Sequence, residues 1–162
     1  MDRNSKNKRK FTLGIISDTH GLLRPEAVAA LQGSDLIIHA GDVGRPAILD
    51  ELGLTAPVVA VRGNMDGEDW AYMLKRTEVV KRDRSLFYVI HDISRIDLDP
   101  AAAGIMAVIN GHTHVPLIQE YHGILYINPG SAGPRRRNLP VSVALIHLLG
   151  RSMKAEIIRL KV

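Results

Sequence analysis

Three short apolar runs alternate with helical patterns in the first part of the chain. The runs cover residues 11–16, 35–39 and 57–61, and their β-branched residues are typical of buried strands. Helical patterns over residues 25–31 and 45–54 separate them, each with a proline in its first turn. Strands that alternate with short helices predict parallel β-α-β units, so we expect an α/β fold.

The rest of the chain contains further predicted strands and two short helices. The strands are residues 77–81, 85–90, 105–109, 117–121, 124–127, 141–148 and 153–161. The helices are residues 68–74 and 100–104. Because no repeat or linker interrupts this order, residues 11–162 are expected to form a single domain.

Composition narrows the class of protein. A chain of 162 residues with 46% apolar residues is long enough for one substantial core. No run approaches the ~18–20 apolar residues of a membrane span, so no membrane partner is expected. The sequence has no cysteine, which excludes disulfides and cysteine-ligated zinc. Any metal must therefore be bound through nitrogen and oxygen atoms.

The net charge of +4 lies at one end of the chain. Residues 1–10 contain five basic residues and one acidic residue, and the remainder contains 16 of each. This polar segment lacks the apolar core of a signal peptide and is predicted to be a flexible basic tail. The neutral remainder argues against nucleic acid beyond weak contacts of the tail. A cytoplasmic location is expected.

Polar side chains follow each of the first three predicted strands. Asp18 and His20 follow the first strand, Asp42 follows the second, and Asn64 follows the third. Because ligand sites of open parallel sheets form outside the carboxyl ends of the strands, we expect these side chains to gather there.

Three histidines extend this set. His91 ends a predicted strand, and His112 and His114 follow the strand at residues 105–109. Histidines two residues apart project to the same side of an extended backbone, and Gly111 before them permits close approach. The candidate metal ligands are Asp18, His20, Asp42, Asn64, His91, His112 and His114.

These ligands predict a particular chemistry. Nitrogen and hard oxygen donors suit Mn²⁺, Fe²⁺, Zn²⁺, Ni²⁺ or Co²⁺ better than Ca²⁺. Seven ligands are too many for one ion and fit two ions that share a carboxylate. Two ions ~3.5–4 Å apart suit in-line displacement at phosphorus, because they acidify a bridging water and neutralise charge on the phosphoryl oxygens.

A family resemblance rests on five motifs: Asp18-Thr19-His20, Gly41-Asp42, Gly63-Asn64, His91 and Gly111-His112-Thr113-His114. In this order and spacing, the chain resembles the calcineurin-like metallophosphoesterase superfamily over about residues 11–148. The short length and the turn at residues 128–131 look most like its small bacterial and archaeal phosphodiesterases. The retromer subunit with a metallophosphoesterase fold belongs beside that branch.

The resemblance implies a four-layer α/β/β/α sandwich of two mixed sheets flanked by helices. It divides the ligands into Asp18, His20 and His114 for one ion, Asn64, His91 and His112 for the other, and Asp42 as the bridge. Asp42, Asn64 and His112 are then the expected catalytic residues, with a metal-bridging hydroxide as the nucleophile. The implied cofactors are two divalent ions, Mn²⁺ preferred, and the implied substrate is a small phosphoester.

Two positions depart from the family pattern. Many members have a histidine directly after the asparagine, where it protonates the leaving group, whereas Met65 follows Asn64 here. A thioether cannot supply a proton, so we expect weak activity on esters with basic leaving groups. The family usually has His-Gly where this chain has His91-Asp92. Asp92 either orients a ligand imidazole or is an ordinary loop carboxylate.

Other polar residues have alternative interpretations. Arg135, Arg136 and Arg137 either form a solvated loop or supply one side chain that binds phosphate. His39 lies within a predicted strand and is expected to be buried and hydrogen-bonded. Asp66 adjoins Asn64 and is a weaker site candidate.

Two functions from different classes follow. The favoured one is a metal-dependent phosphodiesterase, because the full ligand set is present. The alternative is a catalytically weak or inactive interaction scaffold of the same fold, as the resemblance to the retromer subunit implies. The oligomeric state stays open, with a homo-oligomer as one alternative.

Overall fold

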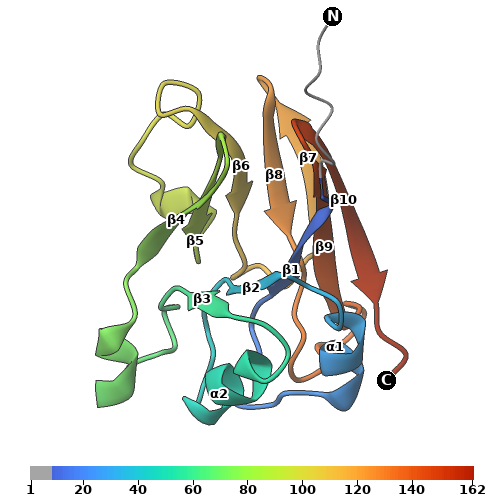
Figure 1. Ribbon diagram of the computed structural model, residues 1–162. Helices are drawn as coiled ribbons and strands as arrows, with labels where there is room; N and C mark the ends of the chain where they lie inside the picture. The colour runs from blue at the N-terminus through green and yellow to red at the C-terminus, as the bar shows by residue number, and fades with distance from the viewer. Residues whose placement is uncertain (1–8) are drawn as a thin grey trace, which may run out of the picture.

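The computed structural model describes residues 9–162, whose strands form two mixed five-stranded sheets packed face to face (Figure 1). Residues 1–8 of the predicted tail lie outside the described part of the chain. Arg9 contacts the body, because its guanidinium lies 3.3 Å from a carboxylate oxygen of Asp35. Among residues 9–162, no helix is long and apolar enough to cross a membrane.

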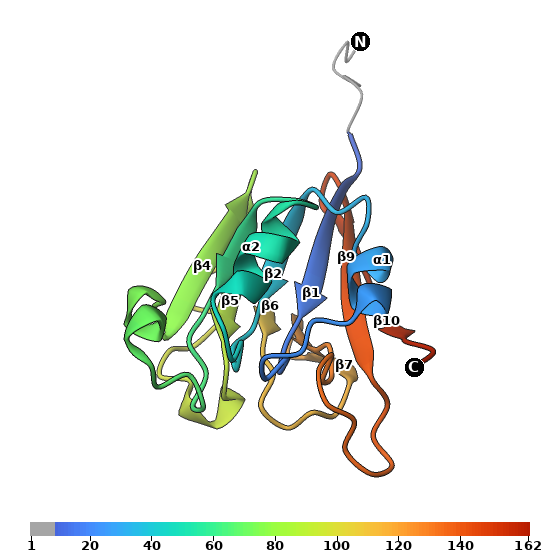
Figure 2. The same ribbon diagram turned by 90° about the horizontal axis from the view of Figure 1, so that it is seen from below.

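The first sheet contains the predicted parallel unit. Its order is β10-β9-β1-β2-β3, and the strands are β1 (Phe11–Ile16), β2 (Leu36–His39), β3 (Val58–Ala60), β9 (Ser142–Leu149) and β10 (Ser152–Arg159). β1, β2 and β3 run parallel, and β9 and β10 are antiparallel to their neighbours. Helices α1 (Pro25–Ala30) and α2 (Ala47–Gly53) cover its outer face (Figure 2). These predicted strands and helices are confirmed.

The second sheet has the order β4-β5-β6-β8-β7. Its strands are β4 (Thr77–Arg82), β5 (Ser85–Ile90), β6 (Ile105–Ile109), β7 (Leu117–Tyr121) and β8 (Ile124–Asn128). The predicted hairpins β4–β5 and β7–β8 are confirmed. β5, β6 and β8 run parallel, so this sheet is also mixed.

The two predicted short helices of this half have different outcomes. Residues 68–74 contain a single 3-10 helix, η1 (Asp69–Met73). The helix predicted over residues 100–104 is wrong, because this stretch forms consecutive turns. The Asp99 carboxylate accepts hydrogen bonds from two backbone N–H groups at its start. Gly104, at φ 74°, then ends the stretch directly before β6.

Side-chain alternation along the strands builds the core. Leu13 and Ile15 of β1 pack with Phe87 of β5 between the sheets, and all three are fully buried. Ile16, on the opposite face of β1, packs with Leu52 of α2. Because each such burial contributes about 1.5–3 kcal/mol, apolar packing is the main force that holds the sandwich together.

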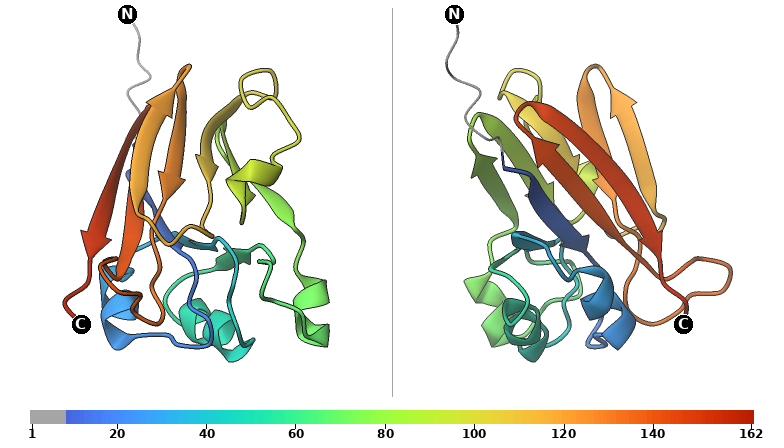
Figure 3. Two further views of the ribbon diagram at one scale, coloured as in Figure 1. Left: turned by 180° about the vertical axis from the view of Figure 1, so that it is seen from behind. Right: turned by 45° about the vertical axis from the view of Figure 1, so that its right-hand side comes forward.

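The outer face of the second sheet is covered by the segment between β5 and β6 (Figure 3). This segment begins with a second 3-10 helix, η2 (Ile93–Arg95). Its side chains Ile93, Ile96 and Leu98 pack in one cluster with Tyr88 of β5. The predicted sandwich is confirmed in its α/β class and its two mixed sheets, with α-helices over the first sheet and this irregular segment over the second.

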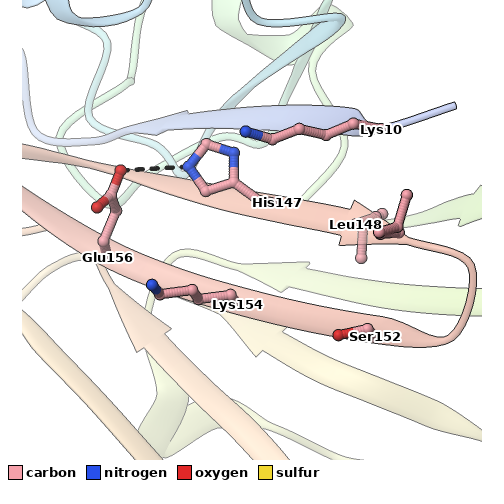
Figure 4. Close-up of a pocket in the computed structure, with 7 residues that line it drawn as sticks. Lys10, His147, Leu148, Ser152, Lys154 and Glu156 are labelled. Atoms are coloured by element: carbon pink, nitrogen blue, oxygen red, sulfur yellow. Dashed lines mark hydrogen bonds and ion pairs between the residues drawn. The ribbon is translucent and has the colours of Figure 1, made fainter.

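A shallow pocket lies on the first sheet, between Lys10 and the ends of β9 and β10 that meet in their hairpin (Figure 4). Lys154 and Glu156 also line it, and Oε1 of Glu156 lies 3.2 Å from Nε2 of His147. None of the seven candidate metal ligands lines this pocket.

Candidate metal centre

Hydrogen bonds hold together the loops that follow the central strands. Asp18 N donates to Gly41 O at 3.0 Å, which joins the loops after β1 and β2. Gly111 N donates to His91 O at 3.0 Å and joins the loops after β5 and β6. His112 N donates to Oδ2 of Asp18 at 3.1 Å, across the two sheets. The strand ends of both sheets therefore meet at one place.

Five of the candidate ligands have a left-handed backbone. Their φ angles are between 45° and 69°, and they are Asp18, His20, Asp42, His112 and His114. The extended backbone predicted for His112 and His114 is therefore wrong. Left-handed residues other than glycine are uncommon and cost about 1–3 kcal/mol each. The left-handed conformation turns these side chains into the space between the loops.

Two glycines permit the close contact of the loops. A Cβ on Gly63 would collide with Asp42, and one on Gly111 would collide with Ser17 and Asp18. Gly111 thus permits close packing against a neighbouring loop, while its predicted close approach to a bound ligand stays a prediction. Ser17 Oγ also donates a hydrogen bond to Oδ2 of Asp18 at 2.7 Å, a contact that no sequence signal predicts.

Asp18, His20 and His114 form a first cluster. Oδ1 of Asp18 lies 3.2 Å from Nε2 of His114 and 3.8 Å from Nε2 of His20. The Nε2 atoms of the two histidines are 3.3 Å apart. Asp18 and His114 are buried, while His20 reaches the surface.

Asp42, Asn64, His91 and His112 form a second cluster. Oδ2 of Asp42 lies 3.2 Å from Nε2 of His91. Oδ1 of Asn64 lies 3.0 Å from Nε2 of His91 and 3.0 Å from Nδ1 of His112. The His112 side chain is 41% exposed, so this cluster opens to solvent on the His112 side.

The two clusters adjoin one another. Oδ1 of Asp18 is 3.9 Å from Nε2 of His91, and Oδ2 of Asp42 is 3.8 Å from Nε2 of His20. Each carboxylate therefore faces imidazoles of both clusters. All seven ligands predicted from the sequence lie together.

The donor atoms of the two clusters fit divalent cations. Oδ1 of Asp18 is buried and has no hydrogen-bond partner among the described residues, because its 3.2 Å contact with Nε2 of His114 lacks hydrogen-bond geometry. A buried carboxylate oxygen normally has such a partner. His91 Nδ1 lies 2.7 Å from Ala40 O and donates to it, so Nε2 faces Asp42. Carboxylate and imidazole donors converge without sulfur, which suits Mn²⁺, Fe²⁺ or Zn²⁺.

The electrostatics of the second cluster agree with cation binding. Burial would raise the pKa of Asp42, but its hydrogen bond with His91 and the charge of that imidazole lower it below the usual value. Burial would lower the pKa of His91, but Asp42 raises it above the usual value. The pair therefore favours carboxylate and imidazolium, and a bound cation would displace the imidazolium proton.

His39 links the two loops of the first sheet. It is fully buried, as predicted. Gly41 N donates to its Nδ1 at 3.2 Å, so Nε2 carries the proton and donates to Thr19 Oγ1 at 2.9 Å. Thr19 Oγ1 donates in turn to Val43 O at 2.8 Å. Burial lowers the pKa of His39 to about 4, which keeps this imidazole neutral at pH 7.

Asp66 holds the loops after β2 and β3. Its buried carboxylate accepts hydrogen bonds from Val43 N at 3.2 Å, Gly44 N at 3.0 Å and Gly63 N at 2.9 Å. It therefore positions the segments that carry Asp42 and Asn64. Its place two residues after Asn64 is the only signal of this role in the sequence.

Three of the remaining predicted residues lie at the edge of the site. The Met65 side chain is 68% exposed, while its backbone N–H donates to Oδ1 of Asp42 at 2.8 Å. Oδ2 of Asp92 lies 3.9 Å from Nε2 of His112. Burial is the main cause that lowers the pKa of His20, and the positive charge of Arg136 lowers it further, so this arginine is within electrostatic reach of the first cluster.

The other two arginines of the run are exposed on the same loop. Arg135 and Arg137 both lie between β8 and β9. The base of this loop is fixed, because Arg24 Nε donates to Gly133 O at 3.1 Å. A phosphate-binding role for one of the three arginines stays a prediction.

His39 predicts a pH dependence of stability in the absence of metal. Its folded pKa of about 4 is below the unfolded value of 6.5, so the unfolded state binds the proton more readily. Stability should fall by about 3 kcal/mol as the pH drops from 6.5 through 4. We expect His39→Gln to lack this component when urea unfolding is measured at pH 7 and pH 4.5. An identical pH dependence in both proteins would contradict the assignment.

Comparison with known proteins agrees with this geometry. The calcineurin-like phosphoesterase superfamily domain matches residues 11–151. A probable metallophosphoesterase of Methanothermobacter thermautotrophicus is 36% identical over 159 residues, which cover 91% of each chain. A phosphodiesterase of Methanocaldococcus jannaschii is 31% identical over 137 residues, 73% of this chain and 82% of that protein.

Vacuolar protein sorting 29 of Cryptosporidium parvum has the same fold, with a TM-score of 0.80 at 18% identity over 94% of this chain and 92% of that one. The chain belongs to the calcineurin-like phosphoesterase superfamily.

Proposed function

We propose that this protein is a dinuclear metal-dependent phosphodiesterase. The observation that carries the proposal is the pair of adjoining ligand clusters. Asp18, His20 and His114 offer one set of donor atoms, and Asp18, Asp42 and His91 offer another. Within each set, the donor atoms lie within 4.8 Å of one another. Relatives named as metallophosphoesterase and phosphodiesterase support the same reaction class.

The ligand assignment follows the two clusters. Asp18, His20 and His114 would hold one ion, and Asn64, His91 and His112 would hold the other. Asp42 is the proposed bridge, as the family resemblance implies, and its Oδ2 faces both His20 and His91 while its Oδ1 accepts the Met65 N–H. Mn²⁺ is the preferred ion for this set of nitrogen and oxygen donors.

When bound, the two ions would lower the pKa of a water between them and neutralise charge on the phosphoryl oxygens. The chain's own residues would orient the reactants. Asp42 and Asn64 would place their donor atoms at the ions, and the hydrogen bonds of Asp66 hold the two loops that carry them. His112 is exposed on the open side and would contact the substrate. Arg136 would bind a non-bridging phosphate oxygen.

The alternative function is an interaction scaffold of the same fold. The structural similarity to a vacuolar sorting protein is the observation in its favour. The buried carboxylates and the five left-handed residues argue for the enzyme, because such strain persists mainly where a site uses it.

The central test combines metals with ligand variants. We expect Mn²⁺-loaded wild type to hydrolyse an activated phosphodiester, and Asp42→Asn or His112→Ala to reduce kcat/KM about 10²-fold or more. His122→Asn is the matched control, because His122 is an exposed histidine with a left-handed backbone in the β7–β8 turn. No activity with Mn²⁺, Ni²⁺, Zn²⁺ or Mg²⁺ would favour the scaffold.

Met65 predicts the choice of leaving group. Wild type should hydrolyse activated diesters much faster than alkyl monoesters, because no proton donor follows Asn64. Met65→His should raise the rate on alkyl esters at least tenfold, toward the ~10²–10⁴-fold typical of general acid catalysis. The rate on an activated diester should stay nearly constant. Comparable wild-type rates on both substrates would refute this explanation.

Arg136 predicts a change in substrate affinity. Arg136→Ala should raise KM about tenfold, the loss expected for one charge-assisted hydrogen bond. Arg151→Ala is the control, because Arg151 lies exposed in the β9–β10 turn. An unchanged KM after alanine replaces Arg135, Arg136 and Arg137 together would exclude a phosphate role for this loop.

A further inference from the structure

Asp92 brings a carboxylate to the open side of the second cluster. It directly follows His91, and its Oδ2 lies 3.9 Å from Nε2 of His112. The Asp92 side chain is 22% exposed, compared with 41% for His112. This contact joins the loop after β5 to the loop after β6, and the proposed catalytic role of His112 does not require it.

The conformation of Asp92 is fixed by the start of η2. Its Oδ1 accepts hydrogen bonds from Ser94 N at 3.0 Å and from Ser94 Oγ at 2.7 Å. Because this N-cap occupies Oδ1, Oδ2 is the oxygen that reaches other charged groups. Arg95 Nε lies 3.6 Å from the same Oδ2, but its side chain is 77% exposed. Oδ2 therefore lies near two basic groups, the exposed Arg95 guanidinium and the His112 imidazole, which is 3.9 Å away.

The two nitrogens of His112 have different surroundings. Nδ1 lies 3.0 Å from Asn64 Oδ1, and because this amide oxygen is an acceptor, Nδ1 donates the hydrogen bond in the chain alone. Nε2 lies 3.9 Å from Oδ2 of Asp92. A carboxylate beside Nε2 favours the tautomer that carries its proton there, because the N–H dipole then points at the negative charge. A cation bound at Nδ1 would displace the proton that Nδ1 donates to Asn64, and the tautomer with its proton on Nε2 then offers the Nδ1 lone pair to that cation.

We propose that Asp92 is a positioning residue that selects the metal-binding tautomer and orientation of His112. The inference rests on the proposed metal site and assigns a role to a residue that touches neither substrate nor ion.

The competing role for Asp92 is a simple N-cap of η2. Asp92→Asn separates the two roles, because asparagine is an equally good N-cap but carries no charge. Asp97→Asn is the matched control, since Asp97 is an exposed carboxylate on the same segment. Ser94→Ala removes one of the bonds that fix Oδ1 while keeping the charge of Asp92.

The experiment is a calorimetric titration of metal-free full-length protein with Mn²⁺. We expect Asp92→Asn to weaken one of the two binding events about tenfold, the lower end for a partner of a metal-bound histidine. Asp97→Asn should change neither event more than twofold, and Ser94→Ala should give a smaller loss than Asp92→Asn. In a His112→Ala background, Asp92→Asn should have almost no further effect.

Several outcomes would overturn the inference. Unchanged Mn²⁺ affinity in Asp92→Asn would show that Asp92 is only a cap. If Asp92→Asn lowers the Mn²⁺ affinity equally in the wild type and in the His112→Ala background, its effect is one of general charge and does not act through His112. If His112→Ala itself binds Mn²⁺ like wild type, the proposed ligand set fails instead. A thermal melt of each metal-free variant confirms that it is folded before titration.

Discussion

The structure depends on two buried carboxylates, Asp18 and Asp42, that face imidazoles from both sheets. Burying two negative charges is unfavourable unless cations or proton donors compensate them. In the chain alone, the imidazolium of His91 compensates Asp42, and the Ser17 hydroxyl and the His112 N–H bind one oxygen of Asp18. The other oxygen of Asp18 has no such partner among the described residues, and a divalent cation would supply one.

The rest of the fold serves to hold this charged centre in place. The apolar core between the sheets is a rigid support, and the loops at the strand ends carry the strain. Neutral His39 and the Asp66 carboxylate connect successive loops through backbone N–H groups. Neither residue is a candidate ligand, but each fixes the backbone next to one.

The parallel unit and the grouping of the candidate ligands could be predicted because both follow from local pattern. Apolar runs identify strands, and parallel strands bring their ends to one edge, so Asp18, Asp42 and Asn64 could be grouped before any contact was known. The left-handed backbone of His112 could not be predicted, because it depends on a hydrogen bond to Asp18, which is 94 residues away in the sequence. The false helix at residues 100–104 reflects Gly104, whose left-handed backbone stops a weak helical pattern.

The most direct test of this account is anomalous diffraction from crystals grown with Mn²⁺. The account predicts two peaks ~3.5–4 Å apart, as in other two-metal sites. One should lie among Asp18, His20 and His114, and the other among Asn64, His91 and His112, with Asp42 between them. A single peak, or none at these residues, would contradict the dinuclear site.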